Sequence, residues 1–255
     1  MGQRAETMLL DFVRRSEAAT TIDEVLRHGV ALAEKLGATL VSYHYLPAIS
    51  EGTDAARHYR FGFPADWTKT LEAHGANVCD AVRRFSATGG TPRWLSEAAS
   101  MKGFSIADEN CMNAYRTLGL ADILGVPLRG PMGQQGYVGV GFARRPKNDA
   151  LVCCLAQCAA QVVHDRYVSL LPPRERPSLS AREGEVLVGI ARGQSNAELA
   201  AKMGCSTYTV DTYVRRVFAK LGVSDRVNAS LVGLDYGLLS FNAAPGKDYE
   251  FRPPA

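Results

Sequence analysis

The side chains whose types and spacing indicate chemistry most clearly lie between residues 206 and 221. Val210, Val214, Val217 and Leu221 follow the 3.6-residue period and predict the buried stripe of one helix. The opposite face of that helix then presents hydroxyl, aromatic and cationic groups. An α-helix fits the major groove of DNA, where arginine bonds guanine edges and hydroxyl or methyl groups contact other bases. The segment therefore predicts a DNA-reading helix.

Two kinds of DNA contact are expected from this outward face. Arg215, Arg216 and Thr212 are the candidates for reading base edges. Phosphate contacts position a helix without reading sequence. The candidates for phosphate contact are Ser206, Thr209, Tyr213 and Lys220, with Tyr208 completing the face. The two roles are interchangeable at this stage, and an ordinary solvated helix face is the alternative, because arginine and lysine are common at surfaces.

The elements that must position this helix are short helices with strong start signals. Segments 180–183 and 195–198 both read Ser-x-x-Glu, the capping-box pattern of a helix N-terminus. Gly193 and Gly204 stand where a helix must end and turn, and Ser206 is a candidate cap for the third helix. This spacing predicts a helix-turn-helix.

The same segments resemble the LuxR-type helix-turn-helix. The matching residues are Leu179-Ser180-x-Arg182-Glu183-x-Glu185-Val186-Leu187, Gly193-x-Ser195-Asn196-x-Glu198-Leu199-Ala200, Thr209-Val210 and Lys220-Leu221-Gly222-Val223. The resemblance implies an all-α four-helix domain over residues 179–240 that binds double-stranded operator DNA as a homodimer, with its last helix starting near Ser224. The sequence departs from the pattern at Asp211 and Tyr213, where many relatives have lysine and histidine. We expect Asp211 to repel phosphate and to shape operator preference.

The region before residue 172 mixes helices and strands without a regular βαβ alternation, which argues against the receiver domain of a response regulator. Thr21 begins a capping box, and Pro64 favours the start of a helix. Further helices are predicted over 107–118 and 149–171, and strands over 38–46, 58–63, 123–128 and 136–142. We predict an α/β domain over 1–171, a proline-rich linker over 172–178 and a poorly ordered tail over 241–255.

Residue types and spacing in this α/β region resemble the autoinducer-binding domain of quorum-sensing LuxR regulators, an α/β/α sandwich. The resemblance rests on Phe63-Pro64-Ala65-Asp66-Trp67, then Asp80, then Trp94. It implies that Trp67 donates its indole N–H to the lactone carbonyl of an acyl-homoserine lactone and that Asp80 accepts from the ligand amide, which suits a donor-only and an acceptor-only group. Trp94 would wall the pocket. Taken singly, each residue is equally an ordinary core tryptophan or surface carboxylate.

Several departures from the family pattern bear on the ligand. Phe63 and Leu71 replace tyrosines, Ala81 replaces a proline, and Ile123 stands near a usual glycine. Gly139 lies where relatives often supply a hydroxyl, so this position offers space without a side-chain hydrogen bond. Further aromatic candidates for the pocket lining are Tyr43, Tyr45, Tyr59, Phe61, Phe104 and Tyr115, most of which are equally ordinary core residues. We expect an acyl-homoserine lactone with a modified acyl group, or another small apolar amphiphile.

Bulk properties narrow the class of protein. The formal net charge of +3 excludes a polycation that coats nucleic acid, so DNA contact must come from a local surface. Six cysteines without a CxxC pair, and an N-terminus without a signal-peptide pattern, predict the reducing cytoplasm. No apolar run approaches the roughly 20 residues of a membrane span.

Catalysis has no positive support in the sequence. No histidine completes a zinc pattern around Cys153, Cys154 and Cys158, and no histidine has a recognisable nucleophile or base beside it. Neither an enzyme activity nor a metal or cofactor is expected. Two alternatives stay open: a LuxR-type regulator that is independent of ligand or inhibited by it, and a small-molecule-binding domain whose helical part serves as a protein-interaction module.

Overall fold

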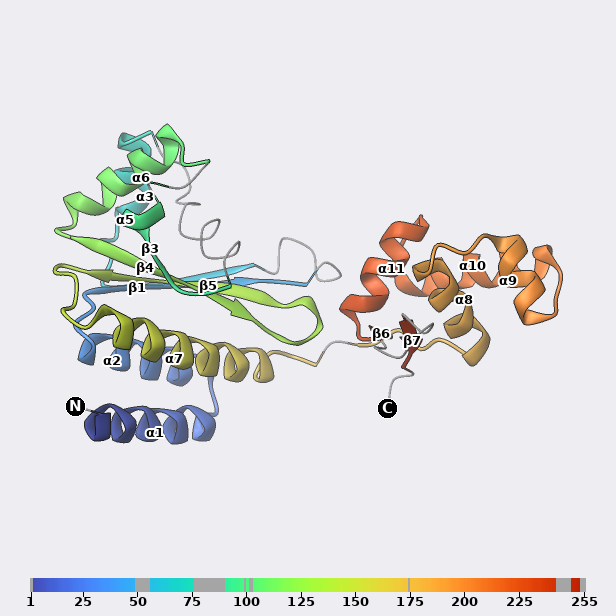
Figure 1. Cartoon of the computed structure of the whole chain (residues 1–255), viewed down its shortest axis with the longest axis horizontal. Coiled ribbons are helices and arrows are strands. Elements are labelled where there is room, and N and C mark those ends of the chain that lie inside the picture. Colours follow the sequence, from blue (N-terminus) through green and yellow to red (C-terminus); the bar gives the residue numbers. More distant parts are fainter. Residues whose placement is uncertain are drawn as a thin grey trace. The chain divides into compact units, whose positions relative to one another are not determined.

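The computed structural model of the chain describes residues 2–48, 56–75, 90–98, 100, 103–173, 175–241 and 249–252. The contacts divide the chain into two compact units, one formed mainly by residues 1–171 and the other mainly by residues 172–255. We call the first the sensor unit and the second the head. Each unit has its own apolar core, so each is described by itself (Figure 1).

A five-stranded antiparallel sheet forms the centre of the sensor unit, in the order β2-β1-β5-β4-β3. Its strands are β1 (Leu40–Leu46), β2 (Arg57–Phe61), β3 (Arg93–Trp94), β4 (Asp122–Arg129) and β5 (Gln135–Phe142). The four strands expected from periodicity are therefore present, within about two residues of their predicted ends. The two-residue strand β3 was not predicted, because so short a segment has no alternation to detect.

Helices cover both faces of this sheet, which confirms the predicted α/β/α sandwich (Figure 1). One face is covered by α2 (Ile22–Lys35) and α7 (Asp149–Ser169), and α1 (Gly2–Ala18) packs on these helices from outside. The other face is covered by α3 (Trp67–Ala73), α5 (Leu95–Ala98) and α6 (Ile106–Thr117). We call these two sides the α7 face and the α6 face. Within the described ranges, no helix is long and apolar enough to cross a membrane.

The head contains the four predicted helices: α8 (Ala181–Ala191), α9 (Asn196–Met203), α10 (Thr207–Leu221) and α11 (Arg226–Asp235). Ser180 and Ser195 form the expected capping boxes, and Ser206 caps α10. Gly204 and Gly222 end α9 and α10 in the left-handed conformation, with φ of 64° and 68°, which glycine adopts without steric cost. The local signals in the sequence thus set the helix boundaries.

The end of the chain differs from the prediction of a disordered tail. Two short strands, β6 (Leu239–Phe241) and β7 (Tyr249–Phe251), pair antiparallel after α11. The ring of Phe251 lies against α8, where a Cβ atom added to Gly184 would meet it at 2.3 Å. Arg192 also donates to the backbone oxygen of Tyr249 at 2.9 Å. The tail prediction was therefore wrong for residues 249–252, which pack on the head.

Candidate ligand pocket and DNA-reading helix

Helix α10 separates an apolar side from a polar side, as its periodicity predicts. Val210 and Val217 are fully buried in the core of the head, whereas Arg215 and Arg216 are exposed. Tyr208, near the start of the helix, is 76% exposed. Within the described part of the chain, neither arginine has a hydrogen bond or ion pair. Both guanidinium groups are therefore available to an external partner.

The hydroxyl groups near the start of α10 are oriented by bonds inside the helix. Ser206 Oγ accepts from the Thr209 N–H at 3.2 Å and lies 2.9 Å from the Thr209 hydroxyl. Thr212 Oγ1 donates to the backbone oxygen of Tyr208 at 3.0 Å. Because that bond uses its only proton, Thr212 can meet a base only as an acceptor or through its methyl group. Tyr213 is half-buried and packs against the core of the head.

Lys220, a candidate for phosphate contact, has a partner inside the head. Its Nζ donates to Glu183 Oε2 at 2.7 Å, and the backbone N–H of Ser180 donates to the same oxygen at 2.7 Å. Burial raises the pKa of Glu183, but the bonds from Lys220 and Ser180 outweigh burial and hold that pKa below its usual value. Lys220 therefore compensates a buried carboxylate of α8.

Asp211, which is expected to repel phosphate and to shape operator preference, is also bonded within the head. Its carboxylate accepts from the Asn196 side chain, and the Asn196 oxygen accepts from Arg226. Arg226 donates in addition to the backbone oxygen of Gln194 at 2.7 Å. These bonds join α9, α10 and α11, so Asp211 helps to hold the helices at fixed angles to one another.

In the sensor unit, Trp67, the candidate donor to a ligand carbonyl, packs among apolar side chains of the α6 face. It is the first residue of α3 and is 2% exposed, and its ring lies 5.0 Å from that of Tyr115 and 5.5 Å from that of Phe63. Leu71 packs one turn later. The Trp67 indole N–H has no hydrogen-bond partner among the described residues. Asp80, the expected second polar group, lies outside the described residues, as does Ala81.

Ile123 and Gly139 also belong to the α6 face. Ile123 packs with Tyr137, and Gly139 lies between Ser42 of β1 and Gly125 of β4. Cys111 of α6 packs with Trp67 and is disulfide-bonded, unlike the reduced thiols expected from the sequence. The free cysteines of the described part are Cys153, Cys154, Cys158 and Cys205.

Trp94 lies on the opposite face of the sheet from Trp67, which corrects the expectation that both wall one pocket. It pairs with Leu124, packs in the α7-face core, and lies 5.4 Å from the ring of Phe142. The guanidinium of Arg145 stacks over the indole at 4.6 Å from the ring centroid. Trp94 is thus part of the packing that holds β3 to the sheet.

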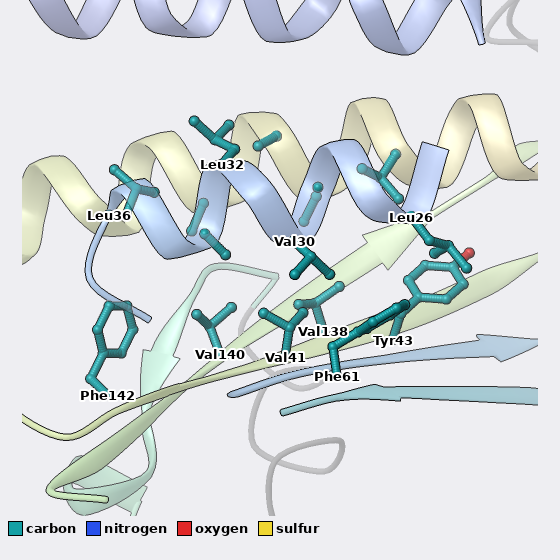
Figure 2. Close-up of a pocket in the computed structure, with 16 residues that line it drawn as sticks. Leu26, Val30, Leu32, Leu36, Val41, Tyr43, Phe61, Val138, Val140 and Phe142 are labelled. Carbon is teal, nitrogen blue, oxygen red and sulfur yellow. The ribbon is translucent and has the colours of Figure 1, made fainter. Parts of the chain in front are cut away.

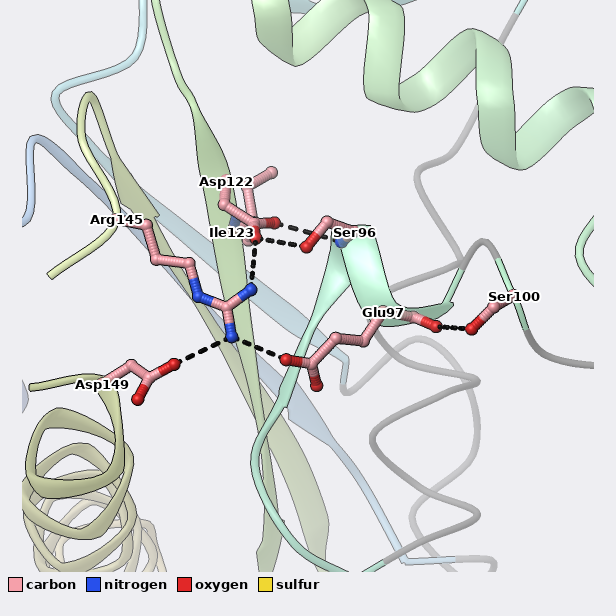
Figure 3. A network of polar contacts seen from close by, with 7 residues as sticks. All are labelled: Ser96, Glu97, Ser100, Asp122, Ile123, Arg145 and Asp149. Carbon is pink, nitrogen blue, oxygen red and sulfur yellow. Dashed lines mark hydrogen bonds and ion pairs between the residues drawn. The ribbon is translucent and has the colours of Figure 1, made fainter. Parts of the chain in front are cut away.

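Arg145 is also the centre of a polar network (Figure 3). It contacts Glu97 Oε1 at 2.6 Å, Asp149 Oδ2 at 2.9 Å and Asp122 Oδ2 at 3.6 Å. Asp122 in turn accepts from the backbone N–H of Ser96 at 3.1 Å. One arginine therefore ties α5, β4 and the start of α7 together, a structural role that accounts for these carboxylates.

Tyr43 and Tyr59 lie on the α7 face, away from Trp67. Tyr43 and 15 apolar residues line a cavity of about 50 Å³ between α2, α7 and the sheet (Figure 2). The Tyr43 hydroxyl bonds His164 Nδ1 at 2.8 Å, and the Tyr59 hydroxyl lies 3.3 Å from that of Tyr167. These hydroxyls are used beneath α7, and the cavity is too small for an acylated lactone. The structure thus separates both tyrosines from the pocket expected around Trp67.

Three polar residues of the α6 face were not among the sequence candidates. His44 of β1 and His58 of β2 lie opposite each other, with their Nδ1 atoms 2.7 Å apart, and Arg60 follows on the same face of β2. The signal was present, because alternate residues of a strand share a face and segment 57–61 places His58 and Arg60 together. The family resemblance, which rests on residues 63–67, 80 and 94, does not include these three residues.

Comparison with known proteins agrees with this geometry. Residues 21–167 match the family model described as the autoinducer binding domain, and residues 177–232 match the model described as bacterial regulatory proteins, luxR family. The HTH-type transcriptional regulator y4qH of Sinorhizobium fredii is 29% identical over 183 residues, which are 69% of this chain and 55% of that protein. The chain thus spans about half the length of this relative.

Solved structures share the fold across both units. The crystal structure of Escherichia coli SdiA superposes with a TM-score of 0.68 at 18% identity, covering 92% of this chain and 98% of that one. SdiA in complex with octanoyl-rac-glycerol gives a TM-score of 0.59 at 18% identity, covering 92% and 94%. Because the autoinducer-binding match alone covers more than half of the residues, the chain belongs to the LuxR family of bacterial regulatory proteins that carry an autoinducer-binding domain.

Proposed function

We propose that this chain is a transcriptional regulator that binds operator DNA through α10 and is controlled by a small amphipathic molecule held on the α6 face of the sensor unit. The observation that carries the proposal is the outward side of α10. Arg215 and Arg216 are exposed and have no partner within the described residues, while the valines opposite them are buried. Free guanidinium groups on a capped helix suit bidentate bonds to guanine. The site of action would be the cytoplasm, where the DNA lies.

A DNA-binding experiment tests this assignment. Duplexes selected from a random pool by the full chain would be titrated with wild-type protein and with Arg215→Ala and Arg216→Ala, across a range of salt concentrations. We expect each variant to lose about 1–3 kcal/mol at its base contact. Arg182→Ala is the matched control, because Arg182 is exposed on α8 and pairs with Glu185. Unchanged affinity and salt dependence in both α10 variants would instead favour a protein-interaction module.

Apolar side chains on α11 support binding as a homodimer. Val227, Leu231 and Leu234 are 69%, 42% and 40% exposed, and their spacing puts them on one side of the helix. Two heads that bury this stripe against each other would present two copies of α10 to paired half-sites. Sedimentation of wild-type protein and Leu231→Glu on operator DNA tests this arrangement, and an unchanged stoichiometry would contradict it.

The ligand part of the proposal rests on Trp67. Its buried indole has no hydrogen-bond partner in the described part, so a ligand carbonyl would satisfy a donor that is otherwise unused. An acyl-homoserine lactone has such a carbonyl, and the SdiA neighbour is described with octanoyl-rac-glycerol. Calorimetric titration of wild-type protein and Trp67→Phe with lactones of several chain lengths tests this role. Binding that is equal in both proteins would remove Trp67 from the site, and mobility shifts with and without ligand would show whether ligand activates or inhibits.

A further inference from the structure

Nitrogen-bearing side chains gather on the α6 face where β1 pairs with β2. His44 and His58 are directly opposed across the two strands, and Arg60 stands opposite Ser42, one step along the same face. The two Nδ1 atoms are 2.7 Å apart, so one imidazole donates and the other accepts. We call His44, His58 and Arg60 the β1–β2 cluster. The proposed DNA-binding function does not use the β1–β2 cluster.

No described residue compensates the positive charge of this cluster. Burial, together with repulsion from His58 and Arg60, lowers the pKa of His44 to about 3. Burial and Arg60 likewise lower the pKa of His58. Both imidazoles are therefore neutral near neutral pH, and Arg60 carries the charge. Among the described residues, no carboxylate acts on either histidine and Arg60 has no ion pair.

Aromatic side chains lie between the β1–β2 cluster and Trp67. The His44 ring stacks on Tyr137 with a centroid separation of 4.1 Å and an interplanar angle of 6°. Tyr137 packs in the same apolar group as Tyr115, whose ring lies 5.0 Å from that of Trp67. The charge of Arg60 also acts on Tyr115. The indole donor and the cationic cluster therefore belong to one side of the sheet, with aromatic surface between them.

We propose that the ligand of this chain is an amphiphile with a carboxylate group, which binds Arg60 and the neighbouring imidazoles while its apolar part packs along Tyr137 and Tyr115. This inference rests on the proposed function, in which a small molecule binds the α6 face. A guanidinium presents a planar pair of donors that matches the two oxygens of a carboxylate. Phe63 and Gly139 also favour a carboxylate over a neutral acyl group, because neither residue supplies a hydroxyl to an acyl carbonyl.

The test compares an acid with its neutral ester on the full-length protein. Decanoate, methyl decanoate and N-octanoyl-homoserine lactone would be titrated by calorimetry into wild-type protein, Arg60→Gln and Arg57→Gln. Arg57 is the matched control, because it lies on the same strand but pairs with Tyr45 on the α7 face. We expect wild-type protein to bind decanoate at least about tenfold more tightly than the ester, since bonds to charged groups have this strength. Arg60→Gln should lose that preference, and Arg57→Gln should keep it.

The outcomes separate this inference from the proposed function. Equal affinity for acid and ester, or an acid preference that survives Arg60→Gln, would overturn the carboxylate assignment. Binding of the lactone without binding of decanoate would overturn it as well, and would leave ligand control by a small molecule intact. If none of the three probes binds, the carboxylate assignment fails, whereas the DNA-binding role of α10 is judged by its own titration. Tryptophan fluorescence of Arg60→Gln before titration checks that the sensor unit is folded.

Discussion

Replacing Lys220 by methionine distinguishes a structural cation from a DNA contact. Methionine keeps most of the apolar stem but removes the ammonium that bonds Glu183, a residue only 3% exposed. Removing a partner from a buried charged group costs about 1.5–3 kcal/mol. Because the Lys220 side chain is 42% exposed, we expect the lower end, about 1.5 kcal/mol. That loss would appear as a lower free energy of unfolding of the head.

Two optical signals allow the two units to be followed in the full-length protein. The chain has two tryptophans, Trp67 and Trp94, and both lie in the sensor unit. In urea titrations their fluorescence therefore reports the sensor unit alone, whereas far-ultraviolet circular dichroism reports helices of both units. We expect Lys220→Met to shift a dichroism transition and to leave the fluorescence transition unchanged. The double variant Glu183→Gln/Lys220→Met should recover most of the loss, since glutamine can still close the capping box.

The alternative for Lys220 makes an opposite prediction. A phosphate contact would leave stability unchanged and would reduce the salt dependence of DNA binding by about one counterion. Unaltered unfolding of Lys220→Met combined with a smaller salt slope would refute the structural role that we assign to this residue.

Three further predictions follow from packing and charge. Gly184→Ala should destabilise the head, because the new methyl group would meet the Phe251 ring. The same change should be tolerated in the Phe251→Ala background. Equal losses of stability in both backgrounds, measured by circular dichroism, would contradict the packing of β7 on α8. Asp211→Ala should cost the head about 1 kcal/mol, because it leaves the Asn196 amide without its acceptor; an unchanged urea midpoint would argue against this contact. The pKa of His44 is about 3 in the folded protein and about 6.5 in the unfolded chain. Below pH 6.5 the unfolded chain therefore binds a proton that the folded sensor unit does not, and the free energy of unfolding falls by ~2 kcal/mol at about pH 5. Unfolding followed by fluorescence should show this loss in the wild type and a smaller one in His44→Gln.

Local signals in the sequence predicted the head well, because helix caps and the apolar stripe of α10 depend on neighbours within a few residues. Ser180, Ser195 and Gly204 act as expected. Lys220 and Asp211 could not be assigned in this way. Their positions on a helical wheel point outward, and only the tertiary placement of Glu183 and Asn196 provides their partners.

In the sensor unit the strands could be predicted, but the faces of the sheet could not. Trp94 matches the family in type and spacing, yet which side of a sheet a side chain takes depends on register, and a one-residue shift reverses it. Here the pairing of Trp94 with Leu124 puts it on the α7 face. Tyr43 and Tyr59 are candidates for the pocket lining by residue type alone, but the alternation of side chains along β1 and β2 places them beneath α7.

The central claim is that α10 binds DNA through its free arginines, and one titration tests it most directly. Fluorescence anisotropy would measure the affinity of wild-type protein, the double variant Arg215→Ala/Arg216→Ala and the control Arg182→Ala for a selected operator duplex at several salt concentrations. The account predicts that the double variant loses specific binding and has a shallower salt dependence, while the control binds like the wild type. A double variant that binds the operator with wild-type affinity and salt dependence would contradict it.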